Sequence, residues 1–191
     1  MAEQAVVRCH CGNFNETIQL RNPIPIPGLL CHCNICRHVT GAATFTGITL
    51  SSPPVEAFQQ KLVKYGTSET ICRYFCGICG SHVGYHVPKE DRWGVSSGNI
   101  DQLLGPSKDK GLLERYTGHK FVGDTIDGGL TRYLPDIPVY MDGSDKPAVK
   151  DLEQELAKVG LASKQVSHQD KLEAACHCGG VQFSLSRPDQ R

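Results

Sequence analysis

The segment FCGICGSH, residues 75–82, decides how this chain folds, because it has the spacing of a zinc-binding turn. Two residues between Cys76 and Cys79 let the backbone reverse, so that both sulfurs face one metal ion. Gly80 allows the tight backbone that follows the second cysteine. Such a turn supplies two of the four ligands of a tetrahedral site. We therefore expect the other two ligands to come from a distant part of the sequence.

A second cysteine pair, Cys9 and Cys11, is the natural donor of the missing ligands. On a strand, residues i and i+2 lie on one face, so both sulfurs would reach the same ion. The two pairs together predict a closed four-cysteine site that joins the first strand to the centre of the chain. The alternative is that both pairs are free, buried cysteines.

Three further cysteines lie in CHCNICR, residues 31–37. Cys31 and Cys33 are expected on one strand face, and Cys36 returns to them after a turn, so all three can bind one ion. Catalytic zinc sites often have three protein ligands and an open fourth position. His32 is expected to point away from this face and is interpreted as a packing residue or a neighbour of the ligands.

The sequence leaves several candidates for the fourth position of this site. They are water, a histidine such as His38 or His82, and a thiol from outside the protein. Cys72 is interpreted instead as a buried cysteine of a strand. His38, His82, Tyr85 and His86 are candidate proton carriers, and the sequence assigns that role to none of them.

The composition narrows the classes of function. The chain has 191 residues, of which 39% are hydrophobic and 21% charged, as in ordinary globular proteins. Lys+Arg and Asp+Glu are both 20, which gives a formal net charge of zero and no basic footprint for nucleic acid. The sequence shows neither a secretory signal nor an apolar stretch of membrane-spanning length. We expect a cytoplasmic protein, and its ten cysteines indicate metal or thiol chemistry rather than disulfides.

The fold class expected from the sequence is mainly β, with a C-terminal helix. The first two thirds of the chain show the β-branched and aromatic enrichment of short strands. A Pro-rich connection at 22–28 is excluded as a central strand, and residues 34–41 are interpreted as a turn or a single helical turn. Apolar residues at helical spacing, with Pro147 near their start and Gly160 after them, predict a helix over 147–159. The segment that follows is expected to be a linker.

The tail repeats the start of the chain. Cys176-His177-Cys178-Gly179 matches Cys9-His10-Cys11-Gly12, and a strand-like segment follows each motif. This echo predicts an incomplete second copy of the first domain, and the alternative is coincidence. The expected organisation is a zinc-binding domain at 1–143, a helix and linker at 144–171, and the start of a second repeat at 172–191.

Five motifs in order carry a resemblance to a known family. Cys-x-Cys-Gly, CHCNICR, RYFCGICGSH, SSGNID and GHKFVGDTIDGGL together resemble the glutathione-dependent formaldehyde-activating enzyme (GFA) family, to which the centromere protein V domain also belongs. The resemblance covers residues 5–135. The FVGDTIDGGL form is similar to fungal members, some of which have two such domains in tandem.

The resemblance implies a β-tent fold of antiparallel sheets with two zinc ions. The structural zinc would be bound by Cys9, Cys11, Cys76 and Cys79, and the catalytic zinc by Cys31, Cys33 and Cys36. Glutathione is implied as cosubstrate, and Arg37 is a candidate for binding one of its carboxylates. One position departs from the family, because many bacterial members have a tryptophan where this chain has Gly128.

Two functions of different classes follow. The first is a zinc-dependent carbon–sulfur lyase or synthase that acts on S-hydroxymethylglutathione or a larger glutathione conjugate, with the thiolate bound at the three-cysteine zinc. The alternative is a non-catalytic, zinc-stabilised binding or scaffold module. A dithiol redox protein that uses Cys76 and Cys79 is disfavoured, because Cys9 and Cys11 complete a metal site with them. The expected partner is a small-molecule thiol, with no nucleic acid and no membrane, and a homodimer is compatible with the sequence.

Overall fold

The computed structural model describes residues 3–21, 23–52, 54–106, 111–158 and 171–186. Its contacts divide the chain into two compact units. The first unit comprises residues 1–29 and 46–117, and the second comprises residues 30–45 and 118–191. Each unit is described by itself.

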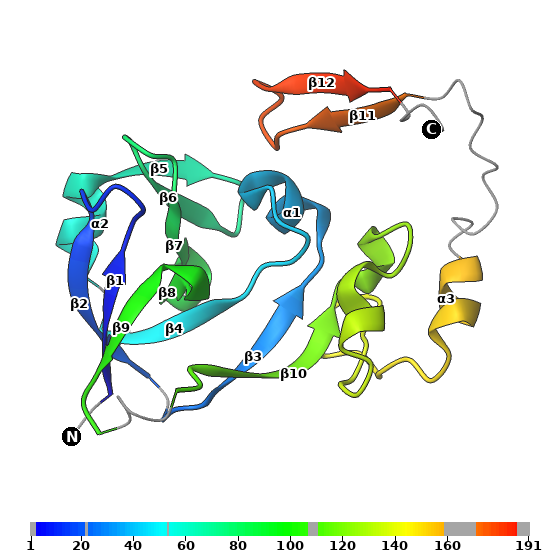
Figure 1. Ribbon diagram of the computed structural model, residues 1–191, viewed down its shortest axis with the longest axis horizontal. Coiled ribbons are helices and arrows are strands. Elements are labelled where there is room, and N and C mark those ends of the chain that lie inside the picture. The colour runs from blue at the N-terminus through cyan, green and yellow to red at the C-terminus, as the bar shows by residue number, and fades with distance from the viewer. Residues whose placement is uncertain (1–2, 22, 53, 107–110, 159–170, 187–191) are drawn as a thin grey trace, which may run out of the picture. The chain divides into compact units, whose positions relative to one another are not determined.

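The first unit is an antiparallel sheet (Figure 1). Within the described residues, its strand order is β5-β6-β7-β8-β4-β2-β1-β9. These strands are β1 (Gln4–Arg8), β2 (Asn15–Leu20), β4 (Gly47–Ser52), β5 (Leu62–Gly66), β6 (Cys72–Cys76), β7 (His82–Val87), β8 (Arg92–Ser96) and β9 (Ile100–Leu104). Short 3₁₀ turns, η1 (Pro88–Glu90) and η2 (Ser97–Asn99), flank β8. The mainly β fold class is thereby confirmed, and it is consistent with a β-tent.

The first hairpin shows how the sequence pattern builds this sheet. Ala5 and Val7 of β1 and Ile18 and Leu20 of β2 alternate with polar residues and are buried. Because side chains alternate between faces along a strand, these four point into the core together. Ala5 pairs with Ile18 in the antiparallel register, which places two buried side chains opposite each other.

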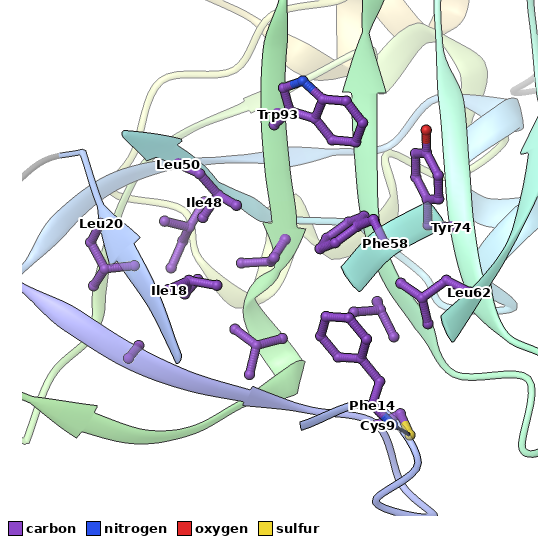
Figure 2. Packing of buried hydrophobic residues seen from close by; sticks show 14 of the residues in the cluster. Cys9, Phe14, Ile18, Leu20, Ile48, Leu50, Phe58, Leu62, Tyr74 and Trp93 are labelled. Atoms are coloured by element: carbon purple, nitrogen blue, oxygen red, sulfur yellow. Dashed lines mark hydrogen bonds between the residues drawn. The ribbon is translucent and has the colours of Figure 1, made fainter. Parts of the chain in front are cut away.

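The core of the first unit is centred on Phe58 (Figure 2). Its ring makes edge contacts with Phe14, Tyr74 and Trp93 at centroid distances of 5.4, 5.2 and 5.8 Å. Such edge-to-face geometry is the favourable arrangement of aromatic quadrupoles. A Cβ on Gly84 would lie 2.5 Å from the Phe58 ring, so the sheet needs a glycine there to receive it.

Phe58 lies on a helix that the sequence analysis did not predict. Helix α2 (Val55–Lys61) begins directly after Pro54 and is one to two turns long. Gln60 Nε2 donates to Glu56 Oε1 at 3.0 Å, which is an i, i+4 pair on the helix surface. The helix has one buried residue, Phe58, so its place in the fold depends on tertiary packing rather than on an amphipathic pattern.

Two strands belong partly to each unit. They are β3 (Ile26–Cys31) and β10 (Glu114–Lys120), which form a two-stranded sheet. The Pro-rich segment therefore contributes to a small sheet and not to the centre of the large one, as its prolines require. Cys31 is the last residue of β3.

The second unit begins with α1 (Asn34–Thr40), a seven-residue helix where the sequence analysis expected a turn or a single helical turn. That expectation underestimated the capping. Cys33 is the N-cap, and its sulfur accepts from Cys36 N at 3.3 Å. Gly41 closes the other end in the left-handed region, where its N–H donates to Arg37 O at 2.8 Å.

The segment after β10 is held by backbone hydrogen bonds. The 3₁₀ turns η3 (Val122–Asp124) and η4 (Gly129–Tyr133) follow the strand. Residues 138–142 then run beside 119–123, with His119 N donating to Pro138 O and Tyr140 N donating to His119 O, each at 2.8 Å. This pairing fixes the backbone on either side of His119.

Helix α3 (Leu152–Lys158) is shorter at its start than the predicted 147–159. Asp151 Oδ1 accepts from Gln154 N at 3.0 Å and so caps the helix there. Val149 N donates to Val139 O at 2.7 Å, which keeps the preceding residues out of the helix. The C-terminal end of the prediction and nearly all of the expected linker lie outside the described residues.

The last described elements are β11 (Leu172–Ala175) and β12 (Gln182–Leu185), an antiparallel hairpin. They cover the segment in which the sequence echo was found. No helix that the structure describes is both long and apolar enough to cross a membrane.

Candidate metal centres

The first unit contains the four-cysteine group expected from spacing. The sulfurs of Cys9, Cys11, Cys76 and Cys79 all lie within 4.8 Å of one another. Cys11 Sγ is 3.6 Å from both Cys9 Sγ and Cys76 Sγ. Four sulfurs at 2.3 Å from a tetrahedral zinc ion would be about 3.8 Å apart, so the arrangement fits this metal closely.

Two tight turns position these ligands. Cys9 and Cys11 lie in the turn between β1 and β2, not on a strand as the sequence analysis assumed. Cys9 N donates to Phe14 O and Gly12 N donates to Cys9 O, each at 3.0 Å. On the other side, Gly80 N donates to Cys76 O at 2.9 Å, and Gly80 adopts φ 71°, as expected for the glycine of the zinc turn.

Hydrogen bonds to the sulfurs of Cys9 and Cys79 favour their thiolate forms. Phe14 N donates to Cys9 Sγ at 3.2 Å. The side chain of Ser81 lies 3.2 Å from Cys79 Sγ, and this hydrogen bond, with the Ser81 backbone, lowers the pKa of Cys79 to about 5. The donors favour the thiolate, which is the form that binds metal.

A separate three-cysteine group lies in the second unit. The sulfurs of Cys31, Cys33 and Cys36 are within 4.8 Å of one another. Cys31 ends β3, Cys33 caps α1 and Cys36 lies in the first turn of that helix. Among the residues that the structure describes, no histidine or carboxylate joins this group as a fourth ligand. The donor set therefore fits zinc with one open coordination position.

The closeness of the three thiols disfavours ionisation of Cys31. Interactions with the Cys33 and Cys36 side chains, followed by burial, raise the pKa of Cys31 strongly. Cys31 and Cys36 are buried. A divalent cation would offset the charge of the thiolates, so the crowding itself argues for a metal here.

A buried histidine pair supports the loop between the ligands. His32 Nε2 lies 3.0 Å from His119 Nδ1, and His119 Nε2 lies 3.1 Å from Leu134 O. Because a carbonyl oxygen only accepts, His119 Nε2 donates to Leu134 O, and a second hydrogen bond joins His119 Nδ1 to His32 Nε2. Burial, followed by the nearby charges of His119 and Arg37, lowers the pKa of His32 to about 4, so this ring is neutral at neutral pH.

The remaining nitrogen of His32 faces a glycine. Within the described residues, His32 Nδ1 is buried without a hydrogen-bond partner. A Cβ on Gly129 would lie 2.5 Å from this atom, and Gly129 has φ 58°. Gly128 has φ 82°, and a Cβ there would lie 3.3 Å from Leu156 of α3. Two adjacent glycines thus let the chain pass between the histidine and the helix.

A family model describes this arrangement. The model of the glutathione-dependent formaldehyde-activating enzyme family matches residues 4–118, which include both cysteine groups. The chain belongs to this family. Membership supports a glutathione-related zinc protein, because the donor sets fit zinc and the family is named for glutathione.

Two further comparisons add little to the GFA assignment. A search of curated proteins found no match. Among solved structures, a crystal structure of a Rhodobacter sphaeroides protein, a structural genomics target, is similar at 25% identity and a TM-score of 0.39. The similarity covers 59% of this chain and 99% of that one.

In this GFA member, Arg37 ties the three-cysteine segment to the turn at η3. Arg37 Nε donates to His32 O at 2.9 Å, and Nη2 donates to Asp124 O at 2.8 Å and to the side chain of Asn34. Asp124 Oδ2 in turn accepts from Asn34 N at 2.8 Å. Arg37 therefore orients the loop that carries the ligands, and a glutathione contact for it stays a prediction.

The other residues considered as ligands or proton carriers have structural contacts. Cys72, on β6, packs against the hydrophobic core and lies outside both cysteine groups. His82 hydrogen-bonds Ser96 Oγ, and burial, followed by the charge of Arg73, lowers its pKa to about 3. His86 stacks on Trp93 at a centroid distance of 4.0 Å. Tyr85 is buried on β7 and His38 lies on α1.

Sequence reasoning located every cysteine of both groups but missed the partners that hold them. His119 and Asp124 are far from the ligands in sequence, and neither belongs to a short metal-binding motif. A usable signal was present in Gly128-Gly129, since adjacent glycines indicate backbone that needs positive φ or close approach.

Proposed function

We propose that this protein is a zinc-dependent carbon–sulfur lyase or synthase that acts on glutathione adducts. S-hydroxymethylglutathione or a larger glutathione conjugate is the proposed substrate. The observation that carries the proposal is the group Cys31, Cys33 and Cys36, which supplies three thiols to one point in a member of the GFA family. A fourth thiol, that of glutathione, would complete a tetrahedral set.

The chemistry requires a thiol to be held as thiolate beside an electrophilic carbon. Zinc bound by three thiolates would supply one open position and lower the pKa of a thiol that occupies it. In the synthetic direction, the glutathione sulfur loses its proton and bonds to the carbon of formaldehyde, the C=O π bond opens, and the carbonyl oxygen takes up a proton to become the hydroxyl. In the lyase direction, the C–S bond breaks, the hydroxyl proton is lost and the sulfur takes up a proton again.

The residues of this chain act by holding geometry. The N-cap position fixes the direction of Cys33, whose sulfur accepts from Cys36 N. The His32–His119 pair fixes the peptide between Cys31 and Cys33, because His32 N also donates to Lys120 O at 2.9 Å. Arg37 and Asp124 hold the first turn of α1. A rigid ligand set of this kind favours orientation of the substrate thiol.

Cobalt substitution of the full chain tests the proposal. Co²⁺ bound to thiolates absorbs in the visible and near ultraviolet, and a further thiolate ligand intensifies this absorption. We expect glutathione to change the spectrum of wild-type protein, and S-methylglutathione, which lacks a free thiol, to leave it unchanged. The Cys36→Ser variant should lose the response while the four-cysteine group keeps its cobalt.

The outcome of this titration separates the two classes of function. The enzyme proposal would be overturned if glutathione left the spectrum unchanged in protein shown to hold cobalt at Cys31, Cys33 and Cys36. That result would favour a zinc-stabilised scaffold. If the spectrum responds, the second measurement is formation and cleavage of S-hydroxymethylglutathione and of larger conjugates, with Cys36→Ser as control.

A further inference from the structure

The C-terminal hairpin reproduces the first hairpin in register. In the first hairpin, Ala5 pairs with Ile18 and Val7 pairs with Glu16. In the tail, the residues at the equivalent places pair in the same way, Leu172 with Leu185 and Ala174 with Phe183. Both hairpins therefore put the same set of positions on the same face of their strands.

The turns of the two hairpins share their hydrogen bonds. Cys176 N donates to Val181 O and Gly179 N donates to Cys176 O, each at 3.0 Å, as Cys9 and Gly12 do in the first hairpin. Val181 N also donates to Cys176 Sγ at 3.3 Å. Gly179 adopts φ 74°, close to the 79° of Gly12. The tail thus has the backbone of a metal-binding turn.

The cysteine pairs also have the same geometry. Cys176 Sγ and Cys178 Sγ are 3.5 Å apart, compared with 3.6 Å for Cys9 Sγ and Cys11 Sγ. This separation is close to the about 3.8 Å expected for two thiolates on one tetrahedral zinc. The two tail thiols therefore already have the spacing of two ligands on one zinc ion.

The two hairpins differ in what covers them. Ala5 and Ile18 are buried in the core, whereas their counterparts Leu172 and Leu185 are 65% and 48% exposed. Phe183, on the same face, is 51% exposed. Adjacent apolar side chains at this exposure are characteristic of a contact surface.

A second copy of this chain can complete the half-site. All ten lie in described residues, and seven of them form the two groups already assigned. Cys72 packs against the core. The remaining pair is Cys176 and Cys178 itself, and a second copy of this chain presents the same two thiols at the same 3.5 Å separation.

We propose that two copies of the protein join through their tails around one zinc ion. Cys176 and Cys178 of each copy supply the four thiolates, and the apolar face formed by Leu172, Val181, Phe183 and Leu185 packs on the same face of the other copy. A twofold axis through the metal makes the contact self-complementary and closed. The Val181 N–H of each copy offsets part of the thiolate charge, as Phe14 N does in the first hairpin.

The test compares the full chain with a tail variant in the presence of a non-thiol reductant. Zinc-loaded wild-type protein should sediment as a dimer and hold about 2.5 zinc ions per chain, since the shared ion counts half for each copy. The Cys176→Ser/Cys178→Ser variant should be a monomer with about 2 zinc ions per chain. Cys72→Ser is the matched control and should remain a dimer.

A second variant separates the metal from the apolar face. Phe183→Ser should keep both tail thiols but weaken dimerisation about tenfold or more, because it removes exposed apolar area from the contact. A wild-type monomer that holds 2 zinc ions per chain, or a Cys176→Ser/Cys178→Ser variant that still dimerises, would overturn the proposal. A monomer with a third bound zinc would also overturn it, since another ligand would then complete the tail site.

Discussion

The two main cysteine groups are built in opposite ways. The four-cysteine group joins two turns that are far apart in sequence, one between β1 and β2 and one between β6 and β7. The three-cysteine group comes from one short segment, residues 31–36. A metal that joins distant segments stabilises the fold, because its binding free energy is gained only when those segments meet. A metal bound by one short segment closes only a short loop and so contributes less to the fold, and three ligands leave a fourth position open.

The largest effect on stability is expected from a substitution in the four-cysteine group. Cys79→Ser should remove one metal ion and lower the free energy of unfolding by about 3 kcal/mol or more, because the zinc turn then no longer holds the first hairpin. Thermal unfolding and metal analysis measure both changes. Cys72→Ser is the control on the same strand pair, and an unchanged midpoint in Cys79→Ser would contradict the structural role.

A substitution in the three-cysteine group should remove function with little effect on stability. Cys36→Ser should abolish the response to glutathione and the carbon–sulfur activity, since two thiolates no longer define an open tetrahedral site. Its thermal midpoint should fall far less than that of Cys79→Ser. Equal destabilisation by Cys36→Ser and Cys79→Ser would show that the two cysteine groups contribute equally to the stability of the fold.

Gly129, which lies beside His32, offers a test of how the three-cysteine group is positioned. Gly129→Ala places a Cβ against His32 Nδ1 and should weaken metal binding at Cys31, Cys33 and Cys36 about tenfold, as loss of outer contacts does in other metal sites. Competition with a chelator measures the affinity, and the cobalt spectrum reports the geometry.

Gly128→Ala is the matched control for this variant. It has the same kind of backbone strain, with φ 82°, but it points toward Leu156 and Thr131 instead of His32. It should destabilise the protein while leaving the metal affinity of the three-cysteine group within a factor of about two. Identical metal affinities for the two alanine variants would exclude a role for His32 in positioning.

The smallest expected effect concerns pH and the first unit. The pKa of His82 is lowered to about 3 by burial, followed by the charge of Arg73. A lowered histidine pKa contributes stability that is present above about pH 6.5 and is lost as the pH falls toward the folded-state value. Between pH 8 and pH 6 the wild-type protein should lose about 0.8 kcal/mol more stability than His82→Gln, measured by denaturant unfolding. Parallel pH profiles would show that His82 does not carry this dependence.

The parts of this protein that follow local chemistry were predictable from the sequence. Cysteine spacing identified both cysteine groups, and residue enrichment identified a mainly β fold, because each depends on neighbouring residues. The echo of Cys9 and Cys11 in the tail also followed from identity of short motifs, and the structure shows that their strand registers agree.

The parts that depend on distant contacts were not predictable. Helix α2 was missed because its one buried residue, Phe58, gives no helical periodicity. The pairing of His32 with His119 joins residues that no local pattern connects. The start of α3 was placed too early because Pro147 is a helix-start signal, whereas the hydrogen bond of Asp151 determines the real boundary.

The absence of a side chain at Gly128 makes room for helix α3. The Cδ atoms of Leu156 and Leu152 lie 3.3 and 3.5 Å from the place that a Cβ on Gly128 would take. A ring at residue 128 would therefore occupy volume that the leucines of α3 fill in this chain. Any transplant of a tryptophan into this position must therefore remove or rebuild residues 152–158 in the same step.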